Sequence, residues 1–272
     1  MFPMYPPGSI ATTVRFPQAR KWARRAFDAF KFERAMRRFI ADPQTAVRSG
    51  SSVLPDLIDG WGNSGWSALD EYLRVGVEHV LQADGAVVEC GTGLSTLLFG
   101  AVAQQRGVEY WALEHLPEWS EKLSQQLARY GVSVQVSTRP LRSYVGFDWY
   151  DPPLHEMPPQ FSLVICDGPP SRTVGVRYGL VPVMRRRLKP GCIILLDDAE
   201  REHEREVAHL WQSELPATAE YLDGSKPLIR LKVQPSALKE RTGLSHGIRT
   251  TSQETRRTVL GASVEGFASS ST

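Results

Sequence analysis

The sequence has few cysteines and no long hydrophobic run, and each shortage excludes a class of protein. The three cysteines, Cys90, Cys166 and Cys192, all fall within or beside apolar segments, and their spacing fits no zinc-binding pattern. We therefore expect buried thiols in a reducing compartment rather than a disulfide framework. No apolar segment approaches the roughly 20 residues of a membrane span, which argues against an integral membrane protein.

The chain also lacks an excess of charge of either sign. Its formal net charge is +2 over 272 residues, so no overall positive potential favours binding to nucleic acid. Residues 1–8 are rich in proline and have no apolar block of the kind found in secretion signals, and we expect a cytoplasmic protein. The length and the apolar fraction of 42% fit one large α/β domain with extensions.

The segment from Gly85 to Gly100 has the order of a nucleotide-binding unit. It reads GAVVECGTGLSTLLFG, which is a short apolar strand, a glycine turn and an apolar segment of helical length. Gly91 can adopt backbone angles that a side chain would forbid, and Gly93 lets the main chain lie against a ligand. The helix N-terminus then directs free N–H groups into the same space.

Acidic side chains at two strand ends distinguish between the possible ligands. A dinucleotide site has a third glycine where this chain has Thr96, and the carboxylate of Glu89 would repel a pyrophosphate. A fixed anion suits S-adenosylmethionine, which carries an ammonium and a sulfonium group. The next strand ends in Glu114, where an acid can accept hydrogen bonds from ribose hydroxyls. The alternative is a plain glycine turn beside two surface acids. We predict that the cofactor-binding residues are Glu89, Gly91, Thr92, Gly93, Ser95, Glu114, His115 and Asp167.

Two later strands also end in carboxylates. The segment 161–166 runs into Asp167-Gly-Pro-Pro, and the segment 192–196 runs into Asp197 and Asp198. Open α/β sheets bind ligands outside the carboxyl ends of their strands, so these acids should face one crevice. We predict Asp167 and Asp198 as catalytic residues that take a proton directly or, together with Asp197, hold a divalent cation. Alternatively, Asp198 caps the following helix and Asp167 binds loop amides.

Other residues are candidates for contact with a substrate. Arg172 and Arg177 fall on what should be the next helix, and Tyr150 belongs to a loop that either forms a substrate wall or only packs. His115 adjoins the ribose acid and is the next candidate base.

The two ends of the chain differ in composition from its middle. Residues 16–41 predict a basic, amphipathic helix with a broad aromatic stripe that includes Phe27 and Phe30. This helix could lie on an anionic membrane surface, but we favour docking on the domain. Residues 236–272 lose apolar periodicity and are expected to form a disordered tail. The expected parts are a helical extension (1–50), one domain (51–235) and the tail (236–272).

Three motifs together carry a resemblance to a known family. Glu89-Cys-Gly-Thr-Gly-Leu-Ser-Thr, Asp167-Gly-Pro-Pro and Leu196-Asp-Asp-Ala-Glu-Arg resemble class I S-adenosylmethionine-dependent methyltransferases, above all a bacterial group with an E-x-G-x-G-x-S-T motif and a D-G-P loop. The resemblance implies a Rossmann-like, doubly wound α/β fold whose seven-stranded sheet has its last strand antiparallel. It also implies that Glu89, Gly91 and Gly93 line the methionine moiety and that Glu114 binds the ribose.

The D-G-P loop that begins at Asp167 is also similar to the loop of plant enzymes that methylate sugar acids in glycans. Metal-dependent catechol-type O-methyltransferases place acids at the same strand ends, but usually have Asn where this chain has Asp198. We therefore predict O-methylation of a small-molecule or glycan hydroxyl, with a divalent metal as an open option and no nucleic-acid partner. The alternatives are an NAD-linked oxidoreductase or epimerase, and a binding protein that keeps the cofactor fold without turnover.

Overall fold

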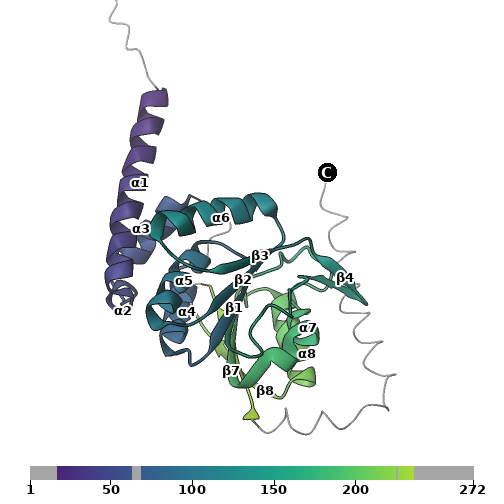
Figure 1. Ribbon diagram of the computed structural model, residues 1–272. Helices are drawn as coiled ribbons and strands as arrows, with labels where there is room; N and C mark the ends of the chain where they lie inside the picture. Colours follow the sequence, from purple (N-terminus) through teal and green to yellow (C-terminus); the bar gives the residue numbers. More distant parts are fainter. Residues whose placement is uncertain (1–16, 63–68, 225, 236–272) are drawn as a thin grey trace, which may run out of the picture.

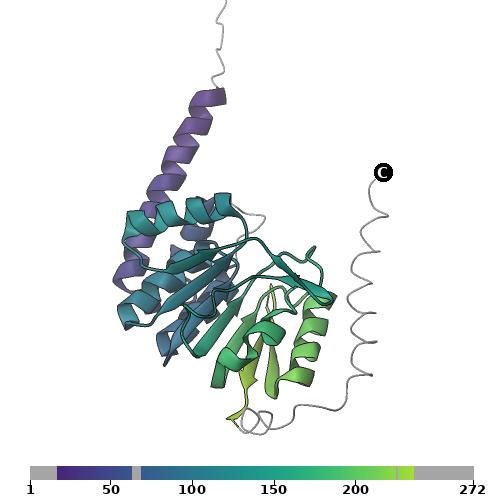
Figure 2. The same ribbon diagram turned by 45° about the vertical axis from the view of Figure 1, so that its right-hand side comes forward.

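The computed structural model describes residues 17–62, 69–224 and 226–235, with side chains from Ala26 onward. These residues build a seven-stranded sheet with helices on both faces and a separate two-stranded sheet (Figures 1 and 2). The strands lie in the order β3-β2-β1-β6-β7-β9-β8. Their bounds are β1 (Ala86–Cys90), β2 (Tyr110–Glu114), β3 (Gln135–Thr138), β6 (Phe161–Cys166), β7 (Leu188–Leu196), β8 (Ala217–Leu222) and β9 (Leu228–Val233). Only β9 runs antiparallel to its neighbours in this described sheet. The predicted doubly wound, seven-stranded α/β fold is confirmed.

Each face of the sheet has its own hydrophobic core. In β6, Leu163 and Ile165 face one core, whereas Val164 and Cys166 face the other. Helices cover both sides, which is why the central strands read as continuous apolar runs. The first face carries α1 (Pro17–Ala41), α3 (Val53–Trp61), α4 (Asp70–Gln82), α5 (Leu94–Arg106) and α6 (Pro117–Tyr130). The second face carries α7 (Leu180–Met184) and α8 (Glu202–Glu214).

Short elements escaped the sequence prediction, whereas long periodic ones did not. The strand expected over residues 161–166 has the expected bounds, and the helix expected over residues 16–41 is described from Pro17 to Ala41. The short helices α2 (Pro43–Ala46) and α3, and the hairpin of β4 (Arg142–Tyr144) and β5 (Phe147–Trp149), were not expected, because three to nine residues carry little periodic signal. The helix before β1, α4, begins at Asp70.

The helix expected to carry Arg172 and Arg177 is a correction. Residues 171–179 form a series of turns, and the helix α7 begins only at Leu180. Gly175 and Val176 have φ angles of 79° and 50°, and this left-handed backbone interrupts a right-handed helix. Both arginines therefore lie on a folded loop between β6 and α7.

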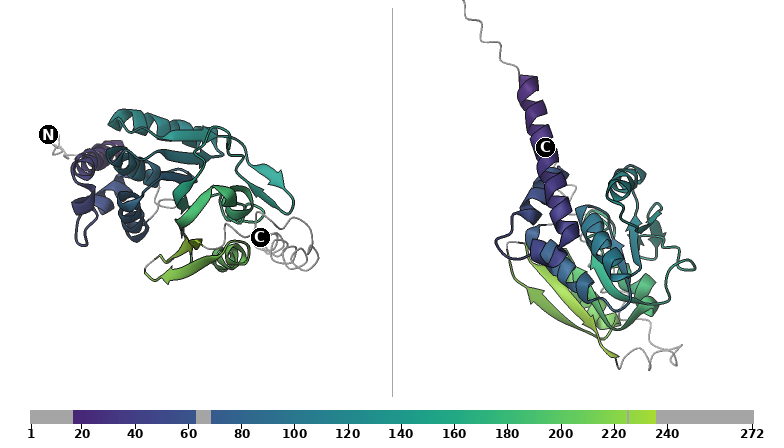
Figure 3. Two further views of the ribbon diagram at one scale, coloured as in Figure 1. Left: turned by 60° about the horizontal axis from the view of Figure 1, so that its bottom comes forward. Right: turned by 60° about the vertical axis from the view of Figure 1, so that its left-hand side comes forward.

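The amphipathic helix α1 is docked through its second half. Phe32, Met36 and Phe39 are buried in the core shared with α3 and α4, whereas Phe27 and Phe30 are 58% and 65% exposed. The expectation that the stripe through Phe30 packs on the domain was therefore wrong, because the buried face of α1 lies on another side of the helix. The first half of α1 extends past the domain (Figures 1 and 3). No described helix is both long and apolar enough to cross a membrane. The expected tail lies outside the described residues.

Candidate functional site

A cleft of about 400 Å³ opens at the carboxyl ends of β1, β2, β6 and β7. This is the edge at which open α/β sheets bind their ligands. Its lining comes from the glycine turn after β1, the loop after β2, the loop after β6, and the segments after β7 and before β9. The residues concerned are Gly91, Thr92, Gly93, Leu94, Ser95, Glu114, His115, Leu116, Trp119, Tyr150, Asp167, Gly168, Pro170, Ser171, Arg172, Arg177, Asp198, Arg201 and Lys226.

Two glycines allow the loops after β1 and β6 to touch. Gly91 has a φ of 91°, and a Cβ atom there would lie 3.3 Å from the backbone nitrogen of Gly168. A Cβ atom on Gly168 would lie 2.3 Å from the hydroxyl oxygen of Tyr150. On the other side of the turn, the N–H of Gly93 donates to Thr96 Oγ1 at 3.0 Å. The threonine that replaces a third glycine therefore fixes the turn to the first turn of α5.

Glu89 lies beneath the turn rather than in the cleft lining. Its side chain is fully buried, and its two carboxylate oxygens accept hydrogen bonds from Ser95 Oγ at 2.5 Å and Tyr110 Oη at 2.9 Å. Burial raises the pKa of Glu89 to about 7, against the lowering effect of hydrogen bonds from Ser95, Thr96 and Tyr110. The carboxyl group is thus close to half ionised at neutral pH.

Glu114 does reach the cleft, and its environment keeps it ionised. Thr92 Oγ1 donates to Glu114 Oε2 at 2.5 Å, and the N–H groups of His115 and Leu116 donate to Oε1 at 2.7 and 2.9 Å. Burial raises the pKa of Glu114, but these bonds and the His115 side chain outweigh it, so the pKa lies below its ordinary value. Trp119 Nε1 donates to the carbonyl oxygen of Thr92 at 2.6 Å and holds this side of the cleft in place.

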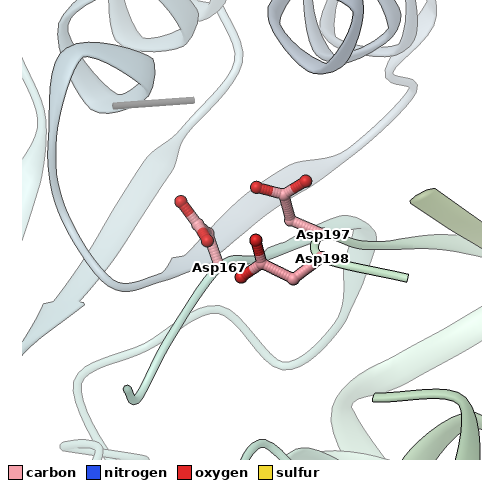
Figure 4. Close-up of side chains that lie close together, drawn as sticks. All are labelled: Asp167, Asp197 and Asp198. Atoms are coloured by element: carbon pink, nitrogen blue, oxygen red, sulfur yellow. The ribbon is translucent and has the colours of Figure 1, made fainter. Parts of the chain in front are cut away.

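Three aspartates from two neighbouring strand ends meet at the other side of the cleft (Figure 4). Oxygen atoms of Asp167, Asp197 and Asp198 lie within 4.8 Å of one another. Asp197 and Asp198 are buried, whereas the Asp167 side chain is 26% exposed. Burial and repulsion by Asp197 raise the pKa of Asp167 well above its ordinary value, with Arg177 acting in the opposite direction.

A buried arginine joins these acids. Arg177 is 2% exposed, and its Nη2 donates to Asp198 Oδ2 at 2.6 Å and to Asp167 Oδ1 at 3.1 Å. Its Nη1 donates to the carbonyl oxygen of Asp197 at 2.7 Å, and Glu204 Oε1 lies 3.7 Å from Nε. Burial lowers the pKa of Arg177, but Glu204, Asp167 and Asp198 together raise it well above its ordinary value. The arginine is therefore a fixed charge.

A lysine forms the second fixed cation. Lys226 Nζ lies 2.8 Å from Asp197 Oδ2 and 2.8 Å from Asp198 Oδ1. Arg201 Nη1 also reaches Asp198 Oδ2, at 2.8 Å. Burial raises the pKa of Asp198, but Arg177 and Lys226 outweigh it and hold the pKa below its ordinary value. Asp198 itself has a φ of 62°, a left-handed conformation that aspartate tolerates better than most residues.

Comparison with known families decides what kind of domain surrounds this cleft. Residues 88–199, which run from β1 through the Asp197-Asp198 pair, match the family model described as a methyltransferase domain. This segment is a methyltransferase domain. The match confirms the resemblance carried by the three sequence motifs. A comparison with curated protein sequences finds no match.

Solved structures of methyltransferases are similar to this chain. The chain is similar to a proposed caffeoyl-CoA O-methyltransferase from Staphylococcus aureus, with a TM-score of 0.50 and 12% identity over 72% of this chain and 98% of that one. An O-methyltransferase from Bacillus cereus in complex with S-adenosylhomocysteine has a TM-score of 0.49 and 16% identity over 71% and 97%. A methyltransferase from Podospora anserina, also with S-adenosylhomocysteine, has a TM-score of 0.49 and 13% identity over 84% and 99%.

Most of the site residues expected from the sequence line this one cleft of the methyltransferase domain. The exceptions are Glu89 and Asp197, which lie buried behind it. The two arginines differ, because Arg172 is exposed at the rim whereas Arg177 is engaged by carboxylates. The hydroxyl of Tyr150 is buried in the lining and has no hydrogen-bond partner among the described residues.

The contacts of Asp198 and Asp167 also bear on the alternatives of a helix cap and of bonds to loop amides. Asp198 does not cap α8, because the N-cap residue is Arg201 and Asp198 forms ion pairs with three cations instead. Among the described residues, the Asp167 carboxylate contacts Arg177 rather than a loop amide.

A divalent metal does not fit the acidic cluster as it is built. Both oxygens of Asp198 are in contact with cationic side chains, and so is one oxygen of Asp197. A metal ion at 2.0–2.6 Å from these oxygens would have to displace Lys226, Arg177 or both. The ligand atoms are close enough for a metal, but most of the oxygen atoms already contact cationic side chains.

Sequence reasoning missed Lys226 and Trp119. Trp119 sits at the third position of α6, but nothing in the spacing of the sequence indicates that its indole faces the glycine turn. Lys226 precedes the last strand, and a signal for it existed. Because an antiparallel last strand begins at the edge where the parallel strands end, residues just before β9 must lie near the cleft.

Proposed function

We propose that the cleft binds S-adenosylmethionine and that the protein transfers its methyl group to the hydroxyl of a small molecule or a glycan. The observation that carries this proposal is the convergence on one cleft of the glycine turn, Glu114 and Asp167, within a segment that matches a methyltransferase domain. The structurally similar protein from Staphylococcus aureus is described as an O-methyltransferase, and this description supports a hydroxyl acceptor.

The residues present fit this cofactor. Glu114 offers carboxylate oxygens that can accept bonds from ribose hydroxyls, and the N-terminus of α5 offers N–H groups to a carboxylate. The unpartnered hydroxyl of Tyr150 offers one further polar contact. Glu89, buried behind the turn, supplies negative potential that favours a cationic ligand without touching it.

Asp167 is the better base of the two predicted catalytic acids. Asp198 is tied into ion pairs that lower its pKa, so it is a weak proton acceptor. Asp167 is partly exposed to the cleft, and its raised pKa makes it the stronger proton acceptor. When bound, S-adenosylmethionine would supply a methyl group attached to a positively charged sulfur. The sulfur is the leaving group and becomes a neutral thioether. Asp167 takes the proton of the acceptor hydroxyl, while Asp198 holds Arg177 and Arg201 in position.

Calorimetry with S-adenosylhomocysteine tests the cofactor assignment. Glu114→Gln should weaken binding about tenfold or more, because it removes a charge-assisted hydrogen bond. Glu109→Gln, at the opposite end of the same strand, should bind like the wild type. Equal affinity in the two variants, or binding of NAD in place of S-adenosylhomocysteine, would contradict the proposal.

Turnover tests the assignment of the base. Release of S-adenosylhomocysteine should be measured over a panel of phenols, alcohols and sugar acids. With the best acceptor, Asp167→Asn should lower kcat by roughly 10²–10⁴-fold and leave the affinity for S-adenosylhomocysteine within about threefold. Near-normal kcat in this variant would move the search to His115, which also lines the cleft.

A further inference from the structure

Lys226 is brought to the acidic cluster by the direction of the last strand. It lies two residues before β9, and the antiparallel pairing of β9 with β7 places it beside the carboxyl end of β7. Its backbone N–H donates to Glu71 Oε2 at 3.3 Å, which ties it to the first turn of α4. The backbone of Lys226 is thus held by two elements.

The ammonium group still has capacity to bind a ligand. It carries three N–H donors, and its two close partners are Asp197 Oδ2 and Asp198 Oδ1, both at 2.8 Å. The Lys226 side chain is 19% exposed and belongs to the cleft lining, on the same side as Asp167. One N–H group is therefore left for an atom bound in the cleft.

Cationic side chains face the carboxyl groups of the cluster without a metal ion. The cluster contains four carboxyl groups, those of Asp167, Asp197, Asp198 and Glu204. They contact three cationic side chains, those of Arg177, Lys226 and Arg201. Removing one partner of such a buried pair leaves an uncompensated buried charge. A divalent cation would also repel the ammonium that it had to displace.

We propose that Lys226 takes the place of a divalent cation in this site, so that methyl transfer proceeds without a metal. This inference rests on the proposed methyltransferase function. The free N–H of Lys226 contacts the acceptor oxygen and stabilises the negative charge that develops as Asp167 removes the hydroxyl proton. The oxygen then forms a bond to the methyl carbon as the carbon–sulfur bond breaks, and the sulfur keeps the electron pair. Proton, methyl group and charge balance with no further reactant.

Titration with Mn²⁺ tests the place of Lys226 independently of any cofactor or acceptor. The wild-type protein should bind Mn²⁺ with a dissociation constant weaker than about 1 mM. Lys226→Gln should bind Mn²⁺ at least about tenfold more tightly, because two carboxylates lose their ammonium partner. Lys232→Gln, on the exposed side of β9, is the matched control and should behave as wild type. Tight wild-type binding that Asp197→Asn abolishes, or no gain in Lys226→Gln, would overturn the inference.

Turnover then tests the contact with the acceptor. Treatment with a chelator should leave wild-type kcat within about twofold, whereas Lys226→Gln should lower kcat at least about tenfold with the affinity for S-adenosylhomocysteine within about threefold. Loss of wild-type turnover on chelation and its return with Mg²⁺ would refute the inference, as would an unchanged kcat in Lys226→Gln. Failure to bind S-adenosylhomocysteine would instead refute the proposed function, and the Mn²⁺ titration would still decide the cation question.

Discussion

The buried carboxyl group of Glu89 should make the stability of the protein depend on pH in a defined direction. Its pKa is about 7 in the folded chain against 4.5 as the ordinary value. Between these values the unfolded chain loses the proton and the folded chain keeps it, so stability falls as pH rises. The full effect is about 3 kcal/mol, of which about 2 kcal/mol falls between pH 5.5 and 8.5.

Replacement of Glu89 by Gln isolates this effect. Glutamine keeps the shape and can still hydrogen-bond to Ser95 and Tyr110, whose hydroxyl groups can donate or accept. The stability of Glu89→Gln relative to wild type should therefore improve by about 2 kcal/mol between pH 5.5 and 8.5. With a urea m-value of about 2–3 kcal/mol/M, the relative midpoint should shift by roughly 1 M.

Equilibrium urea unfolding at several pH values, followed by fluorescence, measures this shift. Glu109→Gln, which removes an exposed carboxylate at the other end of β2, controls for the loss of one charge. If the midpoints of wild type and Glu89→Gln run parallel across this pH range, burial does not hold a proton on Glu89 and the reasoning fails.

Three further substitutions probe other parts of the structure by their effect on urea unfolding. Gly168→Ala should cost about 1–3 kcal/mol, because the added Cβ would lie 2.3 Å from the Tyr150 hydroxyl; a variant as stable as wild type would show that this loop can shift. Arg177→Met should cost about 3–5 kcal/mol, since it leaves buried carboxylates unpaired, and an unchanged midpoint would show that the ion pairs are dispensable. Phe39→Ala should cost about 3–5 kcal/mol and the exposed Phe30→Ala less than about 0.5; equal losses would contradict the docking of α1 through its second half.

The sequence by itself determined the order of the central elements and the edge where the site lies. The strand, glycine turn and helix of residues 85–100 are local features, because backbone angles and hydrophobic period depend on neighbouring residues. The carboxyl ends of parallel strands always share one edge, so Glu114, Asp167 and Asp198 could be placed in one cleft before any contact was known. Their roles in binding and catalysis remain predictions.

Only the tertiary structure decided which way these side chains face and what neutralises them. Glu89 follows a strand as Glu114 does, yet it is buried by Ser95 and Tyr110 and lies behind the turn. The phase of α1 depended on contacts with α3 that its own periodicity does not contain. Arg177 enters the acidic cluster because a left-handed backbone turns its loop inward. Lys226 arrives because β9 runs antiparallel to β7. Such charge pairing joins residues far apart in the chain, so local sequence patterns carry no record of it.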